Sequence, residues 1–184
     1  MGVFGRKKET LAAAEAAAAA ATNRTAGNWR PPPKQYVELG SIDYVNLTHD
    51  GRHGDFQKAL DAAAVTGKPI FANFVEWSGW QGCKDAGRIF ADPVVKKAAE
   101  ELFVPCAFNT WDRGDSYRNQ PMRKWGAGLA SSWWGYLRIV DPEGKLVVTG
   151  TRQITSHRQL EEVKEVMREA LQDLGLDVPS YLAA

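Results

Sequence analysis

Two apolar segments, Ile70–Val75 and residues 103–109, constrain the fold most, because each has the length and composition of a buried strand. Between them the sequence predicts a helix over residues 82–90. A second helical start follows at Asp92 and Pro93, which suit the N-cap and the first helical position. Strands that are joined by a helical crossover pair in parallel. The region therefore predicts the parallel centre of an α/β fold.

The C-terminal half predicts a hairpin and a helix. Tyr136–Val140 and residues 146–149 are apolar segments separated by Asp-Pro-Glu-Gly, a composition typical of a tight turn. Ser156 then opens a Ser-x-x-Gln capping box, and the helix after it has one apolar face and ends at Gly175. We therefore expect a mixed sheet, with parallel central strands and an antiparallel C-terminal hairpin, flanked by helices.

The N-terminal region differs from the rest in composition. Alanine has the highest helix propensity, so residues 9–21 predict a helix, and the three consecutive prolines 31–33 predict an extended linker. We expect residues 1–35 to form an Ala-rich helical extension with a Pro-rich linker. Residues 36–184 are then expected to form the compact domain.

The domain begins with two further elements. Residues 36–47 carry spaced apolar side chains and predict either an edge strand or an ordered approach segment. Asp55 suits the N-cap of a helix that runs to residue 64, and Gly67 suits its termination before Pro69. These elements precede the first central strand.

Charge and cysteine content exclude several functions. The 23 Lys and Arg residues nearly balance the 22 Asp and Glu residues, so no broad positive field is available for nucleic acid. No apolar run reaches the roughly 20 residues of a membrane-spanning helix, so we expect a soluble protein with no membrane insertion. Two cysteines form neither a disulfide framework nor a zinc-like cluster. We expect no metal or cofactor, and a reducing compartment, the cytoplasm or an organelle interior.

Four motifs follow one another in a characteristic order: Gly-Lys-Pro at Gly67, Cys83-Lys84, Phe-Ala-Asp-Pro at Phe90, and Val-Asp-Pro-Glu-Gly-Lys at Val140. In order and spacing they resemble the thioredoxin superfamily, in its branch with Gly-Lys-Pro before the active-site strand and Phe-x-Asp-Pro after the active-site helix. The resemblance covers residues 55–174. It implies a thioredoxin-like fold with the active site at Cys83.

Members of that family carry Trp-Cys-x-x-Cys-Lys, and both thiols are needed for disulfide exchange. Aligning Cys83-Lys84 with the second cysteine and its lysine places Trp80 at the nucleophile position. Aligning Trp77-Ser78 with the Trp-Cys pair instead places Ser78 there. Either alignment removes the attacking thiol, so the resemblance implies an incomplete motif and no ordinary dithiol activity.

The family also has a cis-proline in the loop that faces this motif, and Gly135 takes its place here. The fold would bring several tryptophans to the same end of the sheet. Exposed aromatic rings suit a protein interface, an apolar ligand or a cation. The predicted binding residues at this Trp-rich end of the sheet are Trp77, Ser78, Trp80, Trp111, Trp133, Trp134 and Gly135.

The two cysteines have different expected roles. Cys83 lies near a helix N-terminus, which favours a thiolate, but the family's resolving position is the less exposed one, so an inert structural Cys83 is preferred over a reactive one. Cys106 lies within an apolar strand and is expected to be a core residue. A disulfide between them is conceivable, but the sequence does not show that their Cβ atoms approach closely enough.

Three functional hypotheses follow. The first is a non-catalytic thioredoxin-like protein that binds a partner protein or a small apolar or cationic ligand through the Trp-rich end of the sheet. The second is a one-cysteine oxidoreductase or redox sensor, in which Cys83 is the catalytic residue and an external thiol resolves its adduct. The third is an accessory subunit of a larger assembly, tethered by the N-terminal extension.

Overall fold

The computed structural model describes residues 39–47, 57–75, 81–109 and 135–183. Its elements in chain order are α2 (Gln57–Thr66), β1 (Ile70–Val75), α3 (Gln81–Phe90), α4 (Pro93–Leu102), β2 (Val104–Asn109), β3 (Tyr136–Val140), β4 (Leu146–Gln153), the short 3-10 helix η2 (His157–Gln159), α6 (Leu160–Asp173) and α7 (Ser180–Ala183). Each helix and strand predicted within these residues is present. The predicted N-terminal extension lies outside them.

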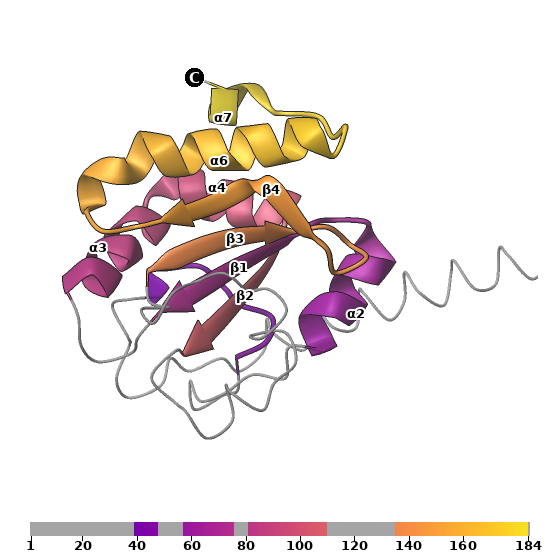
Figure 1. The fold of residues 1–184 in the computed structure, drawn as a ribbon, viewed down its shortest axis with the longest axis horizontal. Coiled ribbons are helices and arrows are strands. Elements are labelled where there is room, and N and C mark those ends of the chain that lie inside the picture. Colours follow the sequence, from indigo (N-terminus) through magenta and orange to yellow (C-terminus); the bar gives the residue numbers. More distant parts are fainter. Residues whose placement is uncertain (1–38, 48–56, 76–80, 110–134, 184) are drawn as a thin grey trace, which may run out of the picture.

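Within the described ranges the sheet has four strands, in the order β2-β1-β3-β4 (Figure 1). β1 pairs in parallel with β2 and antiparallel with β3, and β3 pairs antiparallel with β4. The predicted mixed sheet, with parallel central strands and a C-terminal hairpin, is thus confirmed. Its order is consistent with the thioredoxin-like fold.

Helices cover both faces of the sheet, because successive side chains of β1 point to opposite sides. On one face Phe71 contacts Phe90 and Phe103 edge to face, with ring centroids 5.6 and 6.1 Å apart, in a core that α3, α4, α6 and α7 complete. On the other face α2 packs on β1 and β2, and Phe74 stacks on Phe108 at 4.9 Å. Among the described residues, the sheet separates the two cores.

The helix ends follow the expected local chemistry. Asp92 caps α4, and its Oδ1 accepts hydrogen bonds from the backbone N–H groups of Val94 and Val95 at 2.9 and 3.1 Å. The predicted capping box of Ser156 is present. Gly67 ends α2 at a φ of 68°, in the left-handed region that glycine tolerates. The cap predicted at Asp55 lies outside the described residues.

Segment 39–47 forms no strand but runs along the outer edge of β2. The backbone N–H of Val45 donates to the Pro105 carbonyl at 3.0 Å. The side-chain amide of Asn46 donates to the Ala107 carbonyl at 2.8 Å and accepts from the Ala107 N–H at 2.9 Å. The Asn46 side chain therefore takes the place of a neighbouring strand, because it pairs with backbone groups that would be left without partners at the edge of the sheet. Of the two predictions for this region, the ordered approach segment is confirmed.

Replacing Asn46 by alanine is expected to lower the free energy of unfolding by about 1–3 kcal/mol, because two buried backbone groups of Ala107 lose their partners. Urea denaturation of the two proteins measures the change. Replacing the exposed Asp43, whose backbone N–H and not its side chain donates to Glu100, by alanine is the matched control within the same segment. Equal stability of the Asn46 variant and the control would contradict this role of the amide.

The C-terminus contributes an element that the sequence did not predict. Leu182 in α7 is fully buried in the core, and α7 packs against α4 and α6. Tyr181 donates from its hydroxyl to Glu101 at 3.0 Å, and the Nζ atom of Lys97 lies 4.2 Å from the centre of its ring. α7 is thereby fixed to α4.

None of the helices in the described ranges is both long enough and apolar enough to cross a bilayer.

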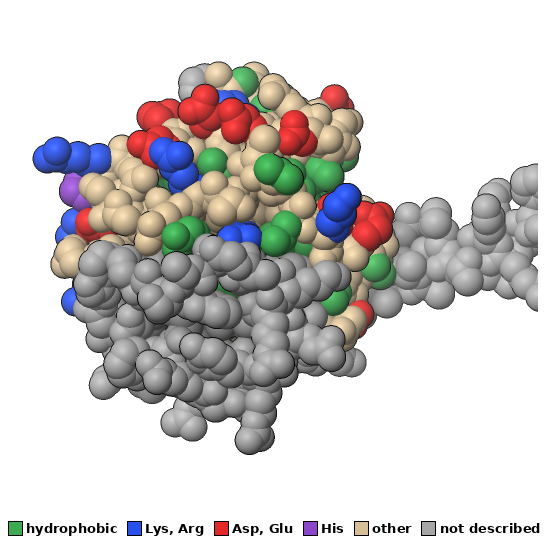
Figure 2. All heavy atoms as spheres, viewed as in Figure 1, with side chains coloured by type: hydrophobic (Ala, Val, Ile, Leu, Met, Phe, Trp, Pro, Cys, Tyr) green, Lys and Arg blue, Asp and Glu red, His purple; other side chains and the backbone are tan. Residues whose placement is uncertain are grey.

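Charged side chains are distributed over the surface. On the face that Figure 2 shows, Asp and Glu side chains gather along the upper edge, over α6, and Lys and Arg are dispersed among them.

Candidate functional site

The candidate site lies at the carboxyl end of β1. Phe74 pairs with Tyr136, so Gly135 stands beside the end of β1, and Val75 packs against Cys83 in the first turn of α3. The structure therefore brings Cys83 and Gly135 to the same end of the sheet. The other predicted site residues lie outside the described residues: Trp77, Ser78, Trp80, Trp111, Trp133 and Trp134.

Cys83 is a core residue. Its exposed fraction is 0%, and it packs against Val75. Leu39 and Leu47, at the two ends of segment 39–47, pack against the same pair. In this arrangement a disulfide in solution does not reach the sulfur of Cys83. The preference for a structural Cys83 agrees with this burial.

Cys106 lies on the opposite face of the sheet. It belongs to the core that α2 covers, whereas Cys83 is part of α3 and packs against Val75, and no disulfide joins the two. Burial raises the pKa of the Cys106 thiol well above its ordinary value, because the thiolate would lose its solvation. Cys106 is therefore confirmed as a small core residue.

Gly135 has a conformation that proline cannot adopt. Its φ is 72°, and a proline ring holds φ near −65°. Its carbonyl accepts a hydrogen bond from the Ile154 N–H at 2.5 Å, and a Cβ atom at this position would lie 2.6 Å from the Ile154 carbonyl oxygen. The backbone at the start of β3 therefore requires a glycine.

A buried polar chain connects β1 to the segment over Cys83. Asn73 is fully buried and donates from Nδ2 to the Tyr44 hydroxyl at 3.0 Å, and Tyr44 donates to the Leu39 carbonyl at 3.3 Å. Burial raises the pKa of Tyr44 well above its ordinary value, so this hydroxyl keeps its proton and remains a donor. The sequence analysis missed the chain, although an asparagine within an apolar strand was its signal.

A polar cluster joins α3 to η2. The Asp85 carboxylate accepts hydrogen bonds from Gln81 Nε2 at 3.1 Å and from Arg88 Nη1 at 3.2 Å, and His157 Nδ1 lies 3.7 Å from the same oxygen. Asp85 is 8% exposed, whereas the side chain of His157 is 52% exposed. The carboxylate is therefore held by groups from two elements.

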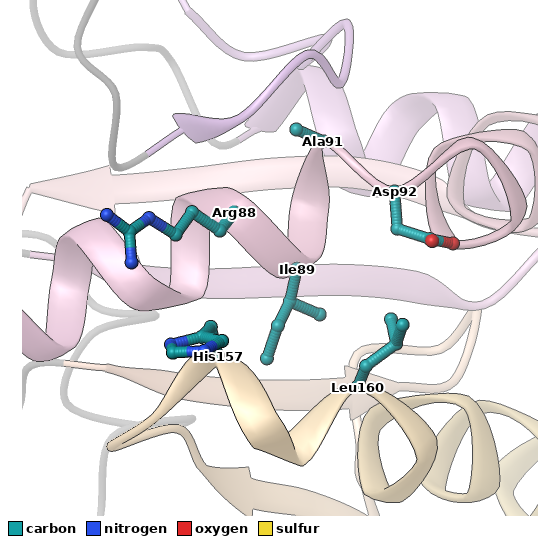
Figure 3. A pocket seen from close by; sticks show the side chains of 6 residues that line it. All are labelled: Arg88, Ile89, Ala91, Asp92, His157 and Leu160. Carbon is teal, nitrogen blue, oxygen red and sulfur yellow. The ribbon is translucent and has the colours of Figure 1, made fainter.

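An open groove of about 260 Å³ lies beside this cluster (Figure 3). Ile89 and Leu160 supply apolar carbon to it, and Arg88 and His157 stand at one end. The Asp92 carboxylate at the other end is engaged in capping α4. Among the described residues, no group of three His, Cys, Asp or Glu side chains is arranged to hold a metal ion.

Comparisons with known proteins give a likeness of fold. No family model matches the chain, and no curated protein matches it. Among solved structures, the chain is similar to one described as "DsbH Oxidoreductase", with 16% sequence identity and a TM-score of 0.47 over 79% of this chain and 98% of that one. The chain's own strand order and pairing therefore carry the description of its fold as a mixed α/β sheet, consistent with the thioredoxin-like class.

Proposed function

We propose that this chain is a non-catalytic thioredoxin-like protein that binds a partner through the end of the sheet where the family's active site lies. The observation that carries the proposal is the burial of Cys83. A nucleophilic cysteine must meet its substrate as an accessible thiolate, and such cysteines lie in partly exposed, electropositive surroundings. Cys83 is instead fully buried, and the described residues that pack against it are Val75, Leu39 and Leu47.

The opposite side of the site supports the same proposal. A positive φ at Gly135 and the hydrogen bond from Ile154 give the start of β3 a shape different from that of a proline loop. The geometry that holds an extended peptide beside two cysteines in the family is therefore not expected here. Both halves of the site depart from the dithiol pattern.

The proposed partner is a protein surface or a small apolar or cationic ligand. This class follows from the tryptophans that the sequence places near the site, since aromatic rings bind apolar surfaces and cations. The proposed contact residues are Trp77, Ser78, Trp80, Trp111, Trp133, Trp134 and Gly135. Their role is binding, with no covalent step.

A disulfide-reduction assay tests the proposal. With insulin as substrate and dithiothreitol as reductant, the full chain is expected to leave the rate of reduction unchanged, because no accessible thiol carries electrons to the substrate. Turnover well above the rate with dithiothreitol alone would contradict the proposal.

A Cys83→Ser variant identifies the source of any turnover. Loss of turnover in this variant would assign the activity to Cys83 and support the one-cysteine alternative. The burial of Cys83 speaks against that alternative. Cys106→Ser is the matched control, since it removes the other buried thiol, on the opposite face of the sheet.

A further inference from the structure

We propose that Arg138 is the centre of a binding site for a small oxyanion, a carboxylate or a phosphate group, on the sheet face that α2 partly covers. Arg138 stands in the middle of β3, opposite Ala72 of β1 and Thr151 of β4. Its neighbours along β3, Leu137 and Ile139, face the core under α3 and α6, so Arg138 points to the other face. The site is thus separate from Cys83.

Arg138 is a buried cation whose charge no described residue balances. It is 8% exposed, and its Nε atom is buried with no hydrogen-bond partner. The ion pairs between described residues involve Arg88, Lys96, Arg152, His157 and Lys164, and none involves Arg138. Buried charges in proteins are ordinarily paired.

An unpaired guanidinium at this place is costly. Arginine keeps its proton in proteins, so it does not escape the cost by becoming neutral. Burial lowers the pKa of Arg138 from its ordinary value, which reflects the loss of solvation of the charged form. An anion bound at the guanidinium would supply the missing charge and a hydrogen-bond acceptor for Nε.

The neighbouring side chains suit an oxyanion. Tyr136 pairs with Gln153, and Arg138 pairs with Thr151, so all four side chains stand on the same sheet face. The three neighbours are partly buried. Each of the four can donate a hydrogen bond, and none is acidic. The set therefore favours an acceptor with negative charge over a cation or an apolar group.

The shape of the guanidinium narrows the class of ligand further. Its planar fork of N–H groups matches two oxygens of one carboxylate or phosphate group, and such bidentate pairs are stronger than neutral hydrogen bonds. A spherical ion such as chloride offers one acceptor atom, where a carboxylate or phosphate group offers two.

A titration followed by NMR tests the proposal on the full ¹⁵N-labelled chain. Sodium phosphate and, separately, sodium acetate are added at constant ionic strength, with sodium chloride as the reference salt. We expect a saturable shift of the Arg138 Nε–H signal with phosphate, acetate or both. The anion that binds with the higher affinity shows whether the site prefers a phosphate or a carboxylate group. Equal, non-saturating shifts in all three salts would overturn the proposal.

Variants locate the site. Arg138→Met is expected to weaken the binding of the stronger anion by about tenfold or more, the loss of a charge-assisted bidentate contact. Arg152→Met is the matched control, because Arg152 pairs with Glu162 on the other face of the sheet. Tyr136→Phe removes one hydroxyl only and is expected to weaken binding by a smaller factor. Unchanged affinity in both the Arg138 and Tyr136 variants would overturn the site.

Stability provides a second and independent readout. In buffer without phosphate or carboxylate, Arg138→Met is expected to unfold at the same or a higher midpoint of denaturation than the natural chain, since an unpaired buried charge is removed. Addition of the stronger anion is expected to raise the midpoint of the natural chain alone. A variant that is less stable than the natural chain in every buffer would show that Arg138 is neutralised within the chain, and would overturn the proposal.

Discussion

Replacement of Phe71 by alanine is expected to lower the free energy of unfolding by about 3–5 kcal/mol. Phe71 is fully buried at the centre of the sheet, and its ring contacts both Phe90 and Phe103. Truncation therefore removes apolar contacts to Phe90 in α3 and to Phe103 directly before β2 in one step. Urea denaturation, followed by circular dichroism, measures the loss.

A surface replacement serves as the control for Phe71. Val148 in β4 is 91% exposed, so Val148→Ala is expected to change the free energy of unfolding by no more than about 0.5 kcal/mol. A Phe71 variant as stable as the Val148 variant would contradict the assignment of Phe71 to the core. The same result would place β1 at the margin of the domain.

The second large effect is expected at Gly40, in the segment that covers Cys83. Gly40 has a φ of 63°, and a Cβ atom there would lie 2.6 Å from the carbonyl carbon of Phe90 and 2.7 Å from the carbonyl oxygen of Gly87. These atoms are helix backbone and cannot move aside cheaply. Gly40→Ala is therefore expected to detach the segment from α3, with a loss of about 1–3 kcal/mol beyond the backbone strain itself.

Gly67→Ala is the matched control for this prediction. Gly67 has a φ of 68°, close to that of Gly40, but a Cβ atom there would meet nothing within 4 Å. The Gly67→Ala variant is expected to lose only about 1–2 kcal/mol of stability, the cost of placing a non-glycine residue in the left-handed region. Parallel denaturation curves give the difference between the two variants. An equal loss in both would show that the close approach of Gly40 to α3 contributes nothing.

The central part of the fold could be predicted because its signals are local. Ile70–Val75 is a short apolar strand that directly follows Gly-Lys-Pro, and the helix start at Asp92-Pro93 uses a cap and a proline within two residues. Residues this close determine their own backbone before tertiary packing adds to it. The hairpin turn and the capping box of Ser156 have the same local character.

Elements that depend on distant contacts were not predictable in the same way. Asn46 pairs with Ala107, 61 positions along the chain, and nothing near Asn46 indicates that its side chain replaces a strand. The short helix α7 has too few residues for a periodic pattern, and its burial depends on Leu182 reaching the core. Such contacts arise from the assembled fold.

The candidate site likewise has features that the sequence predicts and features that depend on distant contacts. The motif around Cys83 and the glycine at 135 could be identified because they hold fixed places relative to the strands. The packing of Leu39 and Leu47 over Cys83 could not be predicted, because these residues come from a segment before α2 that is held in place through Asn73 and Tyr44. The unbalanced Arg138 was also missed, because its burial depends on the pairing of three strands.

Alkylation of Cys83 in the native chain tests the central claim most directly. Iodoacetamide labelling, quantified separately for each cysteine by peptide mass spectrometry, compares the native and the denatured chain, with the buried Cys106 as internal reference. We predict that native Cys83 reacts at least about 100-fold more slowly than in the denatured chain, as Cys106 does, since labelling then requires the structure to open. Rapid native labelling of Cys83 with Cys106 protected would contradict a buried, non-catalytic cysteine.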